Sequence, residues 1–135
     1  MIPGSIFRHE RFQFHDGQTG TKYFIVLGMM GDSIILAVKT TSNCNNRPKT
    51  FGCHLSHKYP SFHLPMRSCC LPVPTWVCLD EFYELEAAPL LKGKFAGIVR
   101  FEGQLAMDTT TALINCAASS DDISPAQVTA IRANP

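Results

Sequence analysis

Two short apolar runs separated by a turn constrain the fold of this chain more than any other feature. Residues 23–27 (Tyr-Phe-Ile-Val-Leu) and 34–38 (Ile-Ile-Leu-Ala-Val) are rich in β-branched and aromatic residues, as is typical of strands buried on both faces. Residues 28–33 between them contain glycine and aspartate, which favour a turn. We therefore predict a hairpin that brings Lys22, before the first strand, and Thr41, after the second, to the same end of a sheet.

The composition indicates one globular domain over residues 1–135. Hydrophobic residues make up 45% of the chain and charged residues 17%, which is enough apolar character for a core. Twelve Lys and Arg against eleven Asp and Glu give a net charge of +1. No global field would therefore attract nucleic acid or an anionic membrane, and a site for a polyanion must be a local patch.

The beginning of the chain and its cysteines bear on its location. Arg8, Glu10 and Arg11 stand where a secretory signal needs an apolar segment, and the longest apolar stretch, residues 23–30, is far shorter than the ~20 residues that span a bilayer. We predict a cytoplasmic protein without a membrane partner. Six cysteines without a C-x-x-C pair are then expected to be mostly free thiols.

Other segments show weaker strand patterns. Further strands are predicted at residues 5–14, 75–79, 82–86 and 97–101, with shorter extended pieces at 50–54 and 62–64. Residues 15–21 have the composition of a mobile loop, and residues 44–74 show the least clear strand or helix pattern. We expect no helix before residue 100.

The spacing of apolar residues changes after Gly103 from that of a strand to that of a helix. Apolar residues between 105 and 117 fall on one face of a helix. Ser124, Pro125 and Gln127 then form an N-cap, a first-turn proline and a capping box, which predicts a helix over residues 125–132. Strands followed by helices indicate an α+β fold, mainly β: a small barrel or strongly curved sheet closed by a helix.

The order of these pieces resembles the PemK/MazF toxins, SH3-like barrels that cut RNA. Pro3-Gly4-Ser5-Ile6-Phe7 is similar to the family's P-G-D-[IV]-[FWY] start. Later matches follow in order: residues 23–27 to [AV]-[LV]-[IV]-[LI], 37–42 to [AV]-x-[PI]-[LI]-T-[ST], 75–80 to S-x-[VI]-x-[LV]-[DE], and 103–105 to G-x-L. The likeness extends to about residue 119.

The resemblance implies a metal-independent endoribonuclease toxin without a cofactor. In that family the 2′-hydroxyl of single-stranded RNA attacks the adjacent phosphorus and leaves a 2′,3′-cyclic phosphate and a free 5′-hydroxyl. Such a reaction needs a base, an acid and groups that stabilise charge on the phosphoryl oxygens. The resemblance also implies a homodimer, a cognate antitoxin that covers the site, and a small SH3-like barrel with a C-terminal helix.

Lys22 and Thr41 match the family's catalytic arginine and threonine. Ser42 completes the T-[ST] pair, and Asp80 matches an acidic position. The chain departs from the pattern at Lys22, which lacks the planar fork of arginine, and at Tyr23, which replaces a proline. The ordinary alternatives remain open: a solvated lysine at a strand end, an exposed edge rich in threonine, and an acidic residue after a strand.

Further candidates come from the residues themselves. His15 lies in the predicted loop and is a possible general base, because histidine titrates near neutral pH. An inert surface histidine is the alternative. The predicted RNA-binding residues form a local basic and aromatic set: Lys39, Arg47, Lys49, Lys58, Tyr59 and Phe62. Trp76, flanked by apolar residues, is predicted to lie in the core. The Cys and His residues between 53 and 70 match no zinc spacing, and we predict no metal site.

Two other functions compete with the nuclease. A non-catalytic SH3-like binding module is favoured by lysine in place of arginine at position 22. A gyrase-poisoning toxin resembling CcdB would need a last helix ending in aromatic residues, and residues 130–135 have none.

Overall fold

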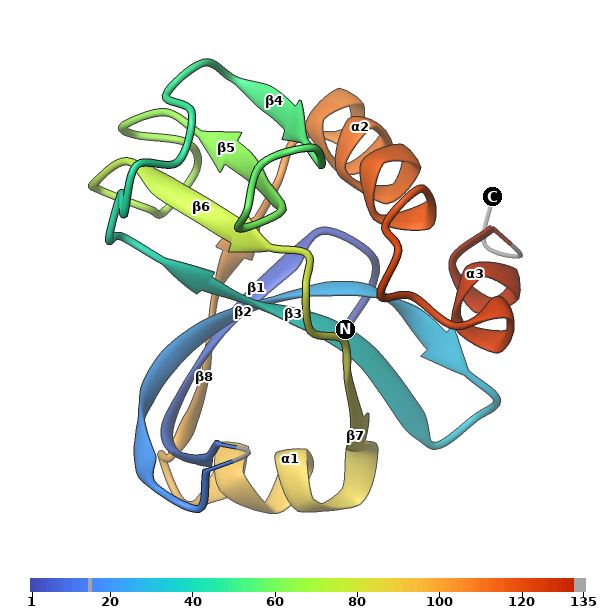
Figure 1. The fold of residues 1–135 in the computed structure, drawn as a ribbon. Helices are drawn as coiled ribbons and strands as arrows, with labels where there is room; N and C mark the ends of the chain where they lie inside the picture. Colours follow the sequence, from blue (N-terminus) through green and yellow to red (C-terminus); the bar gives the residue numbers. More distant parts are fainter. Residues whose placement is uncertain (15, 133–135) are drawn as a thin grey trace.

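The computed structural model describes residues 1–14 and 16–132 and contains eight strands and three helices (Figure 1). The elements are β1 (Ser5–Gln13), β2 (Thr19–Met30), β3 (Ile34–Thr41), β4 (Gly52–His54), β5 (Ser61–Leu64), β6 (Thr75–Cys78), β7 (Tyr83–Glu86), α1 (Ala87–Phe95), β8 (Val99–Gln104), α2 (Met107–Ala118) and α3 (Pro125–Arg132). Within the described ranges, no helix is both long and apolar enough to cross a membrane.

The strands form one antiparallel sheet in the order β4-β5-β6-β3-β2-β1-β8, and β7 pairs with β3 beside this path. The prediction of an α+β fold, mainly β, is confirmed. The sheet does not close into a barrel, because the strands at the two ends of the path, β4 and β8, are not paired with each other.

The predicted hairpin forms the centre of the sheet. β2 and β3 pair antiparallel, with Phe24 opposite Lys39 and Met30 opposite Ile34. The strand runs further than the sequence indicates, so the turn is confined to residues 31–33. Gly31 takes a φ of +68°, which a glycine adopts without steric cost.

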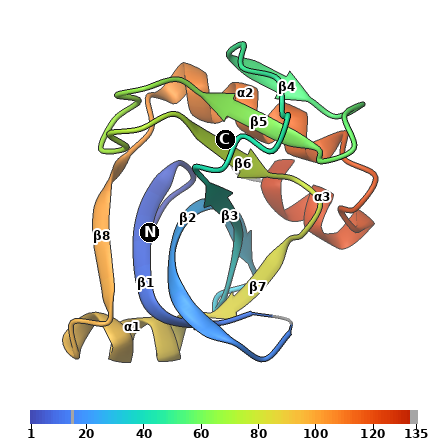
Figure 2. The same cartoon turned by 60° about the vertical axis from the view of Figure 1, so that its left-hand side comes forward.

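The hairpin is buried on both faces, as predicted. Ile25 and Leu27 point into a core cluster with buried residues of α2 and α3, whereas Phe24 and Val26 point into a second cluster that contains Leu90 of α1. Figure 2 shows α1 at one end of the curved strands and α2 at the other, behind β4 and β5. The unbroken apolar run in the sequence is thus a strand between two cores.

The expectation of no helix before residue 100 is wrong, because α1 occupies Ala87–Phe95. Pro89 lies in the first turn, where its missing N–H would have no partner in the helix. Gly93 faces β8: a Cβ on it would lie 2.7 Å from Val99 Cγ2. Proline and glycine both lower helix propensity. Here Pro89 is tolerated because it lies in the first turn, and Gly93 lets the helix pack closely against β8.

The two C-terminal helices agree with the sequence. The predicted bounds of α3 are confirmed, and its capping box is formed: Gln127 N–H donates to Ser124 Oγ at 3.1 Å, and Ser124 N–H donates to Gln127 Oε1 at 2.9 Å. α2 begins two residues later than expected, after Leu105 and Ala106, and buries Leu113, Cys116 and Ala117.

A disulfide joins Cys53 of β4 to Cys116 of α2, at a sequence separation of 63. Cys44, Cys69, Cys70 and Cys78 are free, so most of the cysteines are thiols, as expected, but this pair is not. The bond ties the edge strand β4, which is only three residues long, to a helix that is anchored in the core.

Reduction of this disulfide should lower the free energy of unfolding by about 2–4 kcal/mol, because a crosslink across a long loop restricts the unfolded chain. Urea unfolding with and without a thiol-free reductant measures the difference. A Cys53→Ala variant should show the lower stability in both conditions, and equal stability of the oxidised and reduced wild-type protein would contradict the expectation.

Candidate functional site

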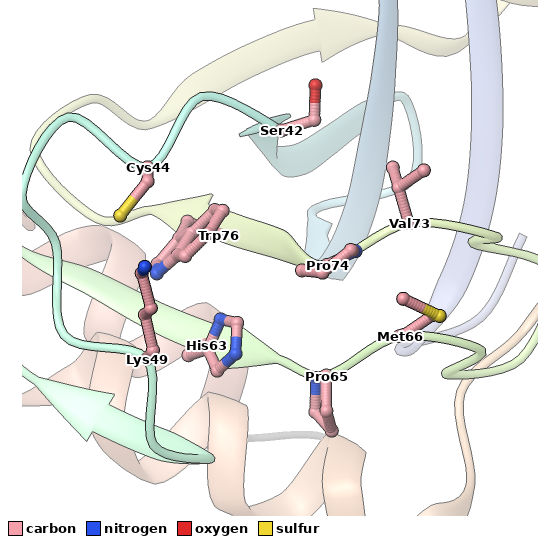
Figure 3. Close-up of a pocket in the computed structure, with 9 residues that line it drawn as sticks. All are labelled: Ser42, Cys44, Lys49, His63, Pro65, Met66, Val73, Pro74 and Trp76. Carbon is pink, nitrogen blue, oxygen red and sulfur yellow. The ribbon is translucent and has the colours of Figure 1, made fainter.

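Two adjoining hollows lie at the end of the β2–β3 hairpin. The hairpin pocket has a volume of about 280 Å³ and is lined by residues 21–23, 40–42, 71–73 and 75. The aromatic pocket has a volume of about 580 Å³ and is lined by Ser42, Cys44, Lys49, His63, Pro65, Met66, Val73, Pro74 and Trp76 (Figure 3). Ser42 and Val73 line both, so the two pockets adjoin each other.

The hairpin pocket brings together the residues that the sequence predicts at this end of the sheet. Lys22, Thr41 and Ser42 all line it. Lys22 Nζ donates a hydrogen bond to the carbonyl oxygen of Thr40 at 3.3 Å, so its side chain lies across β3. Their placement is as predicted, and their chemical role stays a prediction.

Lys22, Thr41 and Ser42 give the hairpin pocket several hydrogen-bond donors. The ammonium group of Lys22 has three protons and gives one to Thr40. Thr41 Oγ1 accepts a hydrogen bond from the Asn43 N–H at 3.1 Å, which leaves its hydroxyl proton for another acceptor. Ser42 is exposed. Among the described residues no carboxylate lines either pocket, so the arrangement suits an anion.

The aromatic pocket is built on β5 and β6. His63 and Trp76 are direct partners in the antiparallel ladder, and their rings lie 4.7 Å apart at an interplanar angle of 33°. The Trp76 indole N–H donates to the carbonyl oxygen of Pro48 at 2.9 Å. This bond holds the segment that carries Cys44 and Lys49 against the sheet, where it forms one wall.

The wall segment turns sharply before it reaches Pro48. Asn45 and Asn46 have φ values of +47° and +63°, and the Arg47 N–H donates to the Cys44 carbonyl at 2.7 Å. Asparagine tolerates the left-handed region better than other residues with a side chain. The Asn-Asn pair in the sequence was the available signal for this turn.

His63, which the sequence indicates only as a possible metal ligand, is a further functional candidate. It is 3% exposed, and burial lowers the pKa of its imidazole, against an opposing hydrogen bond to the Thr75 backbone and together with the charge of His54. Its Nδ1 is buried and has no hydrogen-bond partner within the described part of the chain. Trp76, also 3% exposed, is a core residue as predicted, yet it lines the pocket.

Lys39 and Asp80 line neither pocket. Lys39 Nζ forms an ion pair with Glu81 at 2.9 Å; burial acts to lower its pKa, but the hydrogen bond and charge of Glu81 raise it overall. Glu81 also accepts a hydrogen bond from the Tyr83 hydroxyl at 3.0 Å, and burial together with this bond raises the pKa of Tyr83 to about 12. Asp80 is exposed and lines neither pocket.

The predicted RNA-binding set is divided. Lys49 lines the aromatic pocket, whereas Arg47 and Lys58 lie over the ring of Tyr59, at 4.9 and 5.5 Å from its centroid. The prediction that Phe62 stacks on a base is wrong, because its ring is 1% exposed and belongs to the core. In the strand β5 its neighbour His63 faces the pocket instead.

His15 is the predicted general base in the loop before β2, and it lies outside the described residues. Cys53, one of the soft ligands weighed for zinc, is bonded to Cys116. Within residues 1–14 and 16–132 no three His, Cys, Asp or Glu side chains are grouped so that they could hold a metal ion.

Burial of His63 predicts that the fold loses stability on mild acidification. Burial lowers the pKa values of His63 and His9 below the ordinary value of 6.5, so between that value and the folded pKa the unfolded chain binds more protons. The free energy of unfolding should therefore fall as pH decreases from 7.5 to 5.5, by at most about 1.4 kcal/mol per pH unit for each group.

Urea unfolding at several pH values measures this slope, and His63→Gln should flatten it. Trp76 is the only tryptophan of the chain, so its fluorescence reports on the stacked imidazole directly. A cationic imidazole quenches indole emission, so emission should drop as pH falls through the pKa of His63. A midpoint above 6.5 would contradict the expected direction.

Comparison of the chain with protein-family models, with curated proteins and with solved structures gives no significant match. The functional interpretation therefore rests on the residues and geometry of the two pockets. The strongest of these observations is a lysine and two hydroxyl groups that face one hollow beside an aromatic one.

Proposed function

We propose that this chain binds single-stranded RNA across the two pockets and cleaves it by attack of a 2′-hydroxyl on the adjacent phosphorus. The observation that carries the proposal is the donor set of the hairpin pocket, Lys22, Thr41 and Ser42, in a lining without a carboxylate among the described residues. A phosphodiester supplies the anionic oxygens that such a set accepts.

The pocket supports charge stabilisation better than proton transfer. Lys22 and the free hydroxyl proton of Thr41 can both reach toward phosphoryl oxygens on which charge develops. No His, Asp, Glu or Cys lines the hairpin pocket within the described residues. General acid–base catalysis contributes roughly 10²–10⁴-fold, so we propose a slow enzyme that does not require a metal.

The rest of the proposal follows the resemblance to PemK/MazF toxins. The bent sheet is proposed to be a variant of the SH3-like fold, and the protein a cytoplasmic toxin that acts as a homodimer. A cognate antitoxin would cover the two pockets. What supports this proposal is that Lys22, Thr41 and Ser42, which stand at the family's site positions, line one pocket.

Purified protein should cut an unstructured RNA oligonucleotide in excess EDTA and leave 2′,3′-cyclic phosphate ends, which mass spectrometry identifies. Lys22→Ala should reduce the rate by roughly 10²–10³-fold, as expected for loss of a group that stabilises the transition-state charge. Lys22→Arg should keep or raise the rate, because arginine grips phosphate oxygens at two points. Thr41→Val should also slow cleavage.

Lys92→Ala is the matched control, because Lys92 is an exposed lysine on α1 and lines neither pocket. An oligonucleotide with a 2′-deoxy sugar at the cleaved position should stay intact. Intact RNA after incubation with folded wild-type protein would overturn the proposal of nuclease activity. If that RNA were still bound, the second candidate, a non-catalytic RNA-binding module, would hold. The lack of a His, Asp, Glu or Cys in the described lining of the hairpin pocket favours it.

A further inference from the structure

We propose that the aromatic pocket is a subsite for a guanine base, next to the phosphate site of the hairpin pocket. This inference rests on the proposed function and adds the chemical identity of the recognised base. Its evidence is the shape of the pocket, the lysine that lines it, and the two residues that it shares with the hairpin pocket.

The walls of the pocket suit a flat ring. Pro65, Met66, Val73 and Pro74 give it apolar sides, and Figure 3 shows Met66 and Val73 on the opposite side of the hollow from Trp76 and His63. At about 580 Å³ the pocket has room for a purine together with its ribose. Aromatic and apolar side chains accept the π-face of any base, so these walls explain binding but not choice.

The choice of base comes from one polar group. Lys49 is exposed, has no hydrogen bond or ion pair in the described structure, and lines the same side as Trp76 and His63, so its ammonium group is free to donate to a ligand. His63 contributes its ring to the wall, because its Nδ1 is buried and lies out of reach of a bound base.

A free ammonium group selects a base that carries acceptors side by side on one edge. Guanine presents O6 beside N7, which lysine contacts, whereas adenine and cytosine present an amino group there, which is itself a donor. Uracil has the keto oxygen O4 but lacks N7. The order of affinity is therefore guanine, then uracil, then adenine and cytosine.

The position of the pocket suits a nucleotide. Ser42 and Val73 line both hollows, so a base in the aromatic pocket has its phosphate within the hairpin pocket, where Lys22 and Thr41 lie. The base and phosphate sites are then parts of one groove, and guanine would be read beside the bound phosphodiester.

Isothermal titration of the full chain with the four nucleoside 5′-monophosphates tests the subsite, with ribose 5-phosphate as the phosphate-only probe. GMP should bind about tenfold or more tightly than AMP or CMP and should change the emission of Trp76, the only tryptophan. Lys49→Met should remove the preference for GMP. Lys22→Ala should weaken all four nucleotides and keep their ratio.

Lys92→Met is the matched control and should behave as the wild type. Equal affinity for the four nucleotides, affinity for GMP no greater than for ribose 5-phosphate, or tighter binding of UMP, AMP or CMP would overturn the proposal. These ligands have no phosphodiester to cleave, so the outcome is independent of nuclease activity. A preference for GMP in a protein that leaves RNA intact would support the subsite and refute the enzyme.

Discussion

The structure depends on the pairing of strand β3 with three partners. Along one edge β3 pairs with β2, and along the other edge it pairs with β7 over Ile34–Ala37 and with β6 over Thr40 and Thr41. Because β6 and β7 share this edge of β3, the two strands can diverge. β7 continues along the chain into α1, whereas β6 pairs with β5, which pairs with β4. Both candidate pockets lie at the end of β3 that pairs with β6, and Lys22 of β2 lines the hairpin pocket there.

Local signals in the sequence were enough for the central hairpin and for the last helix. Two dense apolar runs around a glycine-containing turn, and a capping box at Ser124 and Gln127, are complete within a few residues. α1 was missed because Pro89 and Gly93 lower helix propensity in general. Their tolerance depends on a position in the first turn and on a close contact with Val99, neither of which is visible along the chain.

The candidate site was predictable in part for the same reason. Lys22 and Thr41 meet because the hairpin fixes their positions, but the aromatic pocket is assembled over longer distances. It needs the indole of Trp76 to reach the carbonyl of Pro48, 28 residues away in sequence. The alternation of strand β5 places Phe62 and Leu64 on one face and His63 on the other, but it does not indicate that the second face lines a pocket.

The dual position of Trp76 divides the pocket into a part that is fixed and a part that can vary. Its ring is packed in the sheet and its N–H holds the neighbouring wall, so a substitution there changes folding and ligand contact together. Met66 and Val73 are exposed on the rim, and Lys49 is exposed on the opposite side of the hollow. Substitutions at the rim alter what the pocket contacts at little cost to the core. Evolution could therefore change which ligand the pocket binds, through substitutions at the rim of the pocket, without changing the fold.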